Sequence, residues 1–153
     1  MLLIATLSVF SIFLVQGDAA FYWKEFDGTI PEDAFAAGLD MFNRPMYIGQ
    51  ALHNNLLIPA KIYQNDNTAY YEFGYKEYQA KDNVKIFCTN QPDQFEWIPS
   101  STKDIKAITG KFLVKGGYEP NTSTYIGRIR TEGEVLVGKV IADSSGDGLY
   151  VTQ

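Results

Sequence analysis

An internal repeat constrains the fold of this chain more than any other feature of its sequence. Tyr47-Ile48-Gly49 recurs 78 residues later as Tyr125-Ile126-Gly127, and both copies are followed 14 positions on by a lysine and a β-branched residue, Lys61-Ile62 and Lys139-Val140. Two upstream anchors also recur: Phe21-x-Trp23 with Phe95-x-Trp97, and Ala37-Gly38-Leu39-Asp40 with Gly116-Gly117-Tyr118-Glu119. Self-similarity at a fixed offset indicates tandem copies of one structural unit.

Both copies have the pattern of β-strands. Short β-branched and aromatic runs are separated by clusters of Asn, Asp, Gly and Pro; the clearest runs are 46–49, 60–63, 69–73 and 84–87. Asn65-Asp66-Asn67 and Ser144 to Gly148 have the composition of tight turns. The strongest helical signal, Pro31 to Ala37, spans one or two turns, with Glu32 and Asp33 as charges at its start. We therefore expect an all-β protein in which two antiparallel repeats form one compact body.

The N-terminus predicts a secreted protein. Residues 1–17 are almost continuously apolar, but the apolar core from Leu2 to Val15 is shorter than the roughly 20 residues that span a bilayer. We interpret 1–17 as a cleaved signal peptide, with cleavage after Ala19 or Ala20 and an uncleaved anchor as alternatives. The expected repeats are then 18–92 and 93–153, the second truncated at its C-terminus, and no later apolar run is long enough to span a membrane.

Charge and cysteine content exclude several classes of protein. With 13 basic and 18 acidic residues, the net charge is -5, and the basic residues are scattered except for Arg128 and Arg130 on one expected strand face. Nucleic acid is therefore not an expected partner. Cys88 is the only cysteine, so an intrachain disulfide cannot form. It ends an apolar run, which favours a buried thiol over a bond between two subunits.

At these anchors the chain resembles the DM-nine repeat family of invertebrate tandem-repeat proteins, whose module also occurs beside pore-forming domains. The first copy matches over most of its length, from Gly28 and Pro31 through AGLD, YIG and a Pro-x-Lys element at Pro59 to Lys61, and on to the strand ending at Cys88. The second copy has GGYE, YIGR and GKV, with Val137 in place of the proline. The family's final turn and strand should follow Tyr150, whereas the sequence ends at Gln153.

The resemblance implies a non-enzymatic, mannose-binding lectin of innate defence that assembles as a dimer and has no cofactor. The family's sugar contacts are the acid of the AG-x-D element and the lysine of the Pro-x-Lys element. Position by position these are Asp40 and Lys61, with Glu119 and Lys139 as the second pair. The chemistry is suitable because a carboxylate accepts from vicinal hydroxyls while an ammonium donates to them, and tyrosine faces pack on the sugar ring. A plain surface ion pair is the alternative for each pair.

Three other patterns carry weaker signals. Asp143-x-Ser145-x-Asp147-Gly148 imitates the start of a calcium loop, but an EF-hand's glutamate would fall beyond Gln153, so we expect a hairpin turn. His53, the only histidine, precedes Asn54-Asn55 in an expected turn and should be exposed; with Cys88 it has no spacing typical of a metal or nucleophile site. Asn121-Thr122-Ser123 is a glycosylation sequon in an expected loop.

These features together predict a secreted protein that binds mannose-containing glycans on microbial or host surfaces, with weak affinity at each site and stronger binding through several sites. The alternative is a secreted structural or protein-interaction module, in which the acids and lysines hold strand ends and exposed aromatics form an interface.

Overall fold

The computed structural model describes residues 2–5, 10–143 and 147–153, and it is nearly all β. The strands are β1 (Leu2–Ala5), β2 (Phe10–Val15), β3 (Tyr22–Glu25), β4 (Ala36–Leu39), β5 (Pro45–His53), β6 (Leu56–Tyr63), β7 (Ala69–Phe73), β8 (Lys76–Ala80), β9 (Val84–Cys88), β10 (Phe95–Ser100), β11 (Phe112–Leu113), β12 (Lys115–Glu119), β13 (Thr122–Arg130), β14 (Val135–Ile141) and β15 (Gly148–Thr152). A 3-10 turn, Pro92–Gln94, and a short helix α1, Thr102–Ile105, complete these elements. The all-β prediction is confirmed.

The predicted strand runs lie inside β5, β6, β7 and β9. Asn54 and Asn55 form the turn between β5 and β6 with φ of 47° and 63°, and Asn65 in the next turn has φ of 65°. Asparagine adopts this left-handed backbone at low cost, which explains why these residues end the strands. The predicted turn at Ser144 to Gly148 falls largely on residues outside the described ranges.

Two local predictions were wrong. Pro31 to Ala37 is a turn that leads into β4, not a helix. The carboxylate of Asp33 does not start a helix but accepts a hydrogen bond from the Tyr22 hydroxyl. His53, expected to be exposed, is half-buried at the end of β5, where its Nδ1 lies 3.1 Å from the Tyr71 hydroxyl and its ring packs on Phe73 at 4.6 Å. Neighbouring strands, which local sequence does not show, supply these contacts.

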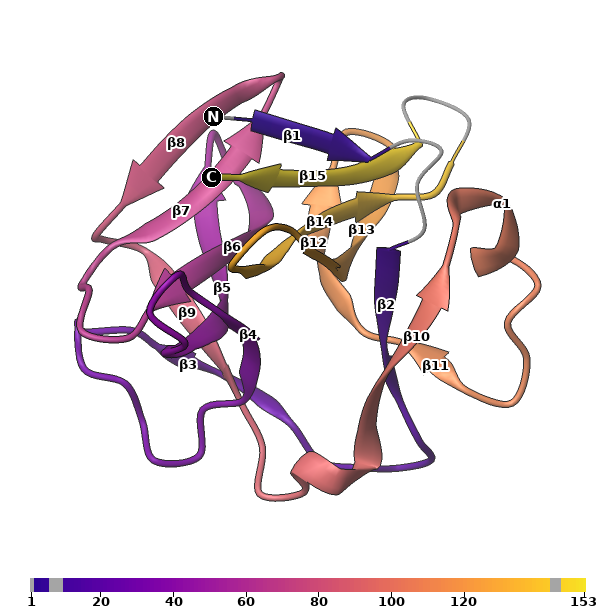
Figure 1. Cartoon of the computed structure of the whole chain (residues 1–153), viewed down its shortest axis with the longest axis horizontal. Helices are drawn as coiled ribbons and strands as arrows, with labels where there is room; N and C mark the ends of the chain where they lie inside the picture. The colour runs from indigo at the N-terminus through magenta and orange to yellow at the C-terminus, as the bar shows by residue number, and fades with distance from the viewer. Residues whose placement is uncertain (1, 6–9, 144–146) are drawn as a thin grey trace.

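Six strands close into a ring at the centre of the molecule (Figure 1). Antiparallel pairing runs from β4 to β5, β6, β12, β13, β14 and back to β4. The two copies of the repeat are interlocked in this ring, because β4 pairs with β14 through Leu39 and Val135, and β12 pairs with β6 through Tyr118 and Leu57. Each copy therefore lends one strand to the sheet of the other.

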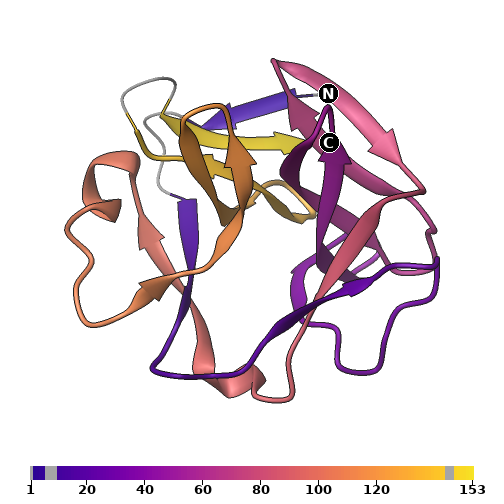
Figure 2. The same ribbon diagram turned by 180° about the vertical axis from the view of Figure 1, so that it is seen from behind.

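The strand pairings define two equivalent units. The first unit comprises β3 to β9. The second comprises β10 and β12 to β15, followed by β1 and β2, because β1 pairs with β15 as β8 pairs with β7, and β2 pairs with β10 and β13 as β9 pairs with β3 and β5. The N-terminal segment thus occupies the positions that β8 and β9 have in the first unit, and β2 takes the place of the final strand expected after Tyr150. Figure 2 shows β2 running beside β10 and β13 from behind.

This arrangement places part of the expected signal peptide in the core. Phe10, Ile12, Phe13 and Leu14 are each no more than 2% exposed. Phe13 packs against Trp97 at 4.5 Å between ring centroids, just as Phe87 packs against Trp23 at 5.4 Å in the first unit. Apolar side chains of both units meet in this core. Signal cleavage, and with it the boundaries 1–17, 18–92 and 93–153, stays a prediction.

Equivalent glycines allow the interlocking strands to approach. Gly38 of β4 and Gly117 of β12 belong to the repeated AGLD and GGYE elements. A Cβ at Gly38 would overlap the carbonyl oxygen of Val135, and one at Gly117 would overlap that of Leu57. The repeated glycine therefore marks the contact at which each unit crosses into the other.

Two further features follow from burial. Cys88 is fully buried and its Sγ lies 3.7 Å from the carbonyl oxygen of Ile86, so the predicted buried thiol is confirmed. Burial, together with the nearby Asp33 carboxylate, raises the pKa of this thiol to about 11. Within the described ranges, no helix is both long and apolar enough to cross a membrane.

Candidate functional site

Lys61 lies near the C-terminal end of β6 with 2% of its surface exposed. Its ammonium donates a hydrogen bond to the main-chain oxygen of Thr152 on β15, in the other unit, and lies 5.2 Å from the centre of the Tyr63 ring. Burial lowers the pKa of this amine to about 8, an effect that the charges of Glu134 and Glu77 partly oppose. Lys61 is thus still charged at neutral pH, but it loses its proton at a lower pH than an exposed lysine does.

A pocket of about 470 Å³ opens over Lys61. Three tyrosines, a carboxylate and two amides contribute to its lining: Lys61, Tyr63, Tyr70, Glu77, Tyr78, Gln79, Thr152 and Gln153. The rings of Tyr63 and Tyr70 meet edge to face at 5.7 Å, and the Tyr70 hydroxyl donates to Asp66 at 2.8 Å, which fixes that ring. The pocket combines the flat apolar faces of tyrosine rings with hydrogen-bond donors and acceptors.

Asp40 is not part of this pocket lining. It is 4% exposed and bonds within its own turn: its Oδ1 accepts from the backbone N–H groups of Phe42 and Arg44, each at 2.9 Å, and its Oδ2 pairs with the Arg44 guanidinium at 2.7 Å. Burial raises the pKa of Asp40, but the bonds from Arg44 and Phe42 outweigh it and the net effect lowers this pKa. The structure therefore does not join Asp40 and Lys61 as the sequence predicted.

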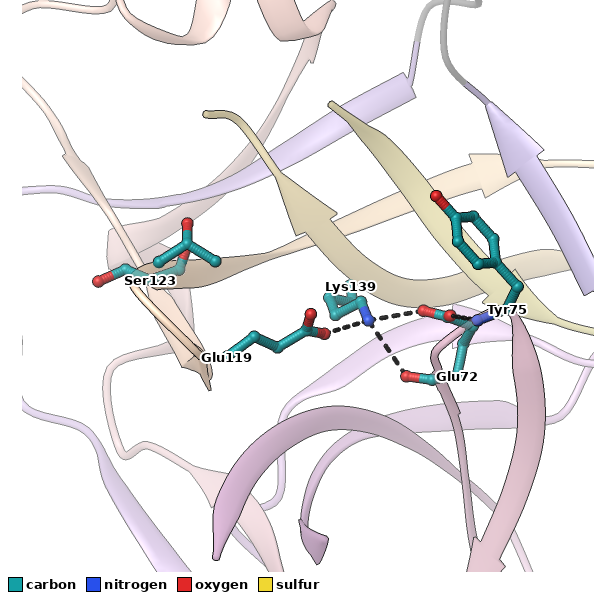
Figure 3. A network of polar contacts seen from close by, with 6 residues as sticks. Glu72, Tyr75, Glu119, Ser123 and Lys139 are labelled. Carbon is teal, nitrogen blue, oxygen red and sulfur yellow. Dashed lines mark hydrogen bonds and ion pairs between the residues drawn. The ribbon is translucent and has the colours of Figure 1, made fainter. Parts of the chain in front are cut away.

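Glu119 and Lys139, the second predicted pair, do come together (Figure 3). The Lys139 ammonium forms an ion pair with Glu119 and another with Oε2 of Glu72 at 2.6 Å, and it also donates to the main-chain oxygen of Glu72 at 3.2 Å. The side chains of Lys139 and Glu72 are each 2% exposed. Their charges are satisfied internally, so this second site is closed.

Sequence reasoning did not find Glu72. It lies on β7, in the first unit, and its Oε1 accepts from the backbone N–H of Tyr75 at 2.6 Å. The available signal was an acid inside an otherwise aromatic strand run, Ala69 to Phe73. A carboxylate that is buried in such a strand needs a charged or hydrogen-bonding partner.

The two lysines occupy equivalent positions. Lys61 pairs in register with Tyr70 on β7, and Lys139 pairs with Tyr150 on β15. Each ammonium reaches across to the other unit, Lys61 to the Thr152 carbonyl and Lys139 to the Glu72 carbonyl. The units differ two residues beyond these tyrosines, where the first unit has an acid, Glu72, and the second has a threonine, Thr152. This difference leaves one lysine beside an open pocket and closes the other.

Asn121 is exposed in the turn between β12 and β13, with φ of 65°. It lies two residues beyond Glu119, and Thr122 of the sequon begins β13. Asn43 takes the same left-handed conformation in the equivalent turn of the first unit, with φ of 61°. The sequon is therefore accessible on a hairpin tip, and its glycosylation stays a prediction.

The described residues contain no group of three or more His, Cys, Asp or Glu side chains that could hold a metal ion. The pocket over Lys61 and the interlocked tandem units are instead the features to compare with known proteins. A family model described as the DM9 repeat matches residues 6–80 and 40–152. The chain belongs to the DM9 repeat family. The curated proteins searched gave no match. The two matched ranges confirm the tandem DM9 organisation predicted from the sequence. DM9 repeats are known as a lectin-like binding module.

Proposed function

We propose that this DM9 protein binds carbohydrate through the pocket over Lys61, with mannose-type glycans as its ligands. The observation that carries the proposal is a buried ammonium at a pocket whose lining includes three tyrosines. Sugar rings pack their C–H faces on such aromatic surfaces, while their hydroxyls accept from an ammonium and donate to carboxylate or amide oxygens. Glu77 and Gln79 supply those oxygens here, in place of Asp40.

The proposal assigns different roles to the two lysines. Lys61 contacts the ligand, whereas Lys139 holds Glu72 and Glu119 together. One shallow polar site gives weak affinity for a monosaccharide, because much of the hydrogen-bond energy is lost to desolvation. Useful binding to microbial or host-cell surfaces then requires several copies of the protein on one glycan surface, for which a homodimer would suffice.

Binding to mannan and to methyl mannoside tests this proposal. We expect Lys61→Met to weaken binding by about tenfold or more, because a charged hydrogen bond to the sugar is removed. Lys103→Met, on α1 and exposed, is the matched control and should bind as the wild type does. Circular dichroism of both variants separates a lost contact from a lost fold. Equal binding by wild type and Lys61→Met would exclude this pocket.

Binding should also depend on pH. The amine of Lys61 loses its proton near its pKa of about 8, so the affinity for mannan should decrease as the pH rises through that value. The sugar hydroxyls do not titrate in this range, and the Lys61→Met variant should show no such decrease. A pH-independent affinity would contradict a role for the charged amine.

A second candidate function is a protein-interaction module. Met41 and Phe42 are 72% and 77% exposed at the tip of the turn that Asp40 holds, and the Arg44 guanidinium lies 5.1 Å from the centre of the Phe42 ring. Exposed apolar side chains at one tip are typical of an interface. A folded wild type that binds no glycan on an array would favour this function, and Phe42→Ser should then abolish the partner's binding.

Secretion is part of the proposal and rests on the apolar run of residues 1–17. Intact-mass analysis of the protein expressed in eukaryotic cells tests it. A chain in the medium that begins after Gly17, Ala19 or Ala20 supports secretion with signal cleavage. An intact N-terminus found only inside the cells contradicts secretion and leaves β1 and β2 in place.

A further inference from the structure

A second pocket, of about 320 Å³, lies where β2, β4 and β13 meet the beginning of β14. The residues that line it are apolar except for Ser11 and two arginines, Arg128 and Arg130. The two arginines alternate along β13, so they lie on the same face of the strand. Arg128 is half-buried and Arg130 is exposed, which places one guanidinium deeper than the other.

The deeper guanidinium is held rigidly. Nη1 of Arg128 donates to the Ala37 carbonyl at 2.9 Å, and its planar group lies 4.4 Å from the centre of the Trp97 ring. These contacts orient the group and use only part of its five N–H donors. Burial and the neighbouring charge of Arg130 both lower the pKa of Arg128.

Neither arginine of this pair has an acidic partner, because neither forms an ion pair in the part of the chain that the structure describes. Glu132 and Glu134 follow in the turn after β13, but the charge of Glu134 acts on Lys61 and Tyr63. Asp40, just after β4, pairs with Arg44. Two adjacent guanidiniums repel each other, and a bound anion would remove that repulsion.

The first unit shows that the fold does not require this charge. Gln50 occupies the position equivalent to Arg128, and its Nε2 donates to the Gly116 carbonyl at 2.7 Å, as Arg128 does to Ala37. Leu52 occupies the position equivalent to Arg130, since it pairs with Leu57 as Arg130 pairs with Val135. A neutral side chain thus makes the same bond between units, so the two positive charges of the second unit need another explanation.

We propose that this pocket binds an oxyanion, carboxylate or sulfate, carried by a compact ligand of sugar size. The arginine forks suit the paired oxygens of such a group, and the volume is at the lower end of the range for small-molecule sites. The small apolar residues Ala36, Ala37 and Pro45 leave room for the ligand body. The proposal does not depend on the Lys61 pocket.

Titration of the full chain, residues 1–153, with glucuronate tests the proposal. Calorimetry and NMR of the arginine Nε–Hε groups measure the binding. We expect Arg130→Gln and Arg128→Gln each to weaken binding by about tenfold or more, since each removes a charged contact. Arg128→Gln places at this position the residue that Gln50 provides in the first unit, so the bond to Ala37 and the fold should persist. Lys103→Gln changes the net charge equally and should bind normally.

The ligands distinguish the source of the oxyanion. Competition of inorganic sulfate with glucuronate supports recognition of the charged group itself, and stronger binding of glucuronate supports a contribution from the ligand body. Glucose that binds as well as glucuronate would overturn the proposal, as would unchanged glucuronate binding by both arginine variants. Mannan binding by the arginine variants should stay normal, which separates this result from failure of the Lys61 site.

Discussion

The carboxylate of Asp40 stabilises a turn, and this role explains why an acid and a lysine that recur together need not meet. The sequence singled out both residues because each has a counterpart in the second copy, Glu119 for Asp40 and Lys139 for Lys61. It did not show that the Asp40 carboxylate forms an ion pair with the guanidinium of Arg44, four residues later in the chain. A local partner has a short loop to close, and a partner on another strand must compete with it.

Substitution of Asp40 should therefore lower stability. Asp40→Ala removes the acceptor for two backbone N–H groups and one guanidinium, so its melting temperature should be lower than that of Asp40→Asn, which retains one oxygen. Circular dichroism melting measures both. Loss of mannan binding with unchanged melting in Asp40→Ala would show instead that the carboxylate contacts sugar.

The stabilising effect of Asp40 should also disappear in acid. Its pKa is lowered in the folded protein, so its contribution is fully present above the unfolded pKa of about 4 and is lost as the pH falls through the lower pKa of the folded state. The difference between the unfolding curves of the wild type and Asp40→Asn should therefore shrink as the pH is lowered from neutral through about pH 4 and further into acid. Curves that stay equally far apart would show that the charge is not the cause.

Asp40 bonds within its own turn, whereas Lys139 forms a buried ion pair with Glu72 of the other unit. Lys139→Met leaves the Glu72 carboxylate buried without its counter-charge, which should reduce the free energy of unfolding by about 3–5 kcal/mol. The double variant Lys139→Met, Glu72→Gln should recover part of this loss. Lys111→Met, which breaks a more exposed pair with Glu96, should change stability by no more than about 1 kcal/mol. Equal effects of the two single lysine variants would contradict the buried role.

At the level of elements, the sequence predicted the strands that pair with their neighbours along the chain. β5, β6 and β7 form consecutive hairpins, whose turn residues and alternation are local signals. β4 was missed and the segment before it was interpreted as a helix, because β4 is short and its register with β5 is irregular, and because the preceding segment is held by a bridge between Ala34 and Cys88 of β9, more than fifty residues away in the chain. Long-range pairing overrides a weak helical pattern.

The glycines of β4 and β12 should be the least replaceable residues of these elements. Gly38→Ala and Gly117→Ala each place a Cβ against a main-chain oxygen of the other unit, so each should lower the free energy of unfolding by about 3 kcal/mol or more. Gly133→Ala, at a positive φ in open space, should cost only about 1 kcal/mol. Urea denaturation provides the comparison, and equal losses at all three sites would contradict the close approach of the strands at Gly38 and Gly117.

For the whole molecule, the repeat offset correctly predicted two equivalent units, and the anchors Trp23 and Trp97 do occupy equivalent positions. The interlocking of the units could not be predicted, since it depends on which strand edges meet after collapse. The composite character of the lysine sites follows from the interlocking, because each ammonium reaches a strand of the other unit.

The place of residues 10–15 leads to a prediction about truncation. A chain of residues 18–153 lacks β1 and β2 and leaves Trp97 and Phe95 without Phe13. Its urea unfolding should lose cooperativity, and its tryptophan emission should shift to the red, because apolar core surface becomes hydrated. Deletion of residues 2–5 alone removes only β1 and should have a smaller effect. An unchanged midpoint for 18–153 would show that β2 is dispensable.

The antiparallel pairing of β1 with β15, with Leu2 opposite Thr152, brings the two ends of the chain together (Figure 1). A short linker between them, combined with new ends opened near Gln91, gives a circular permutant. In that order β10 comes first and β9 last, so each unit becomes one uninterrupted stretch of chain. The same set of contacts can thus form with two different orders of the strands along the chain. The fold therefore does not determine where the chain begins and ends.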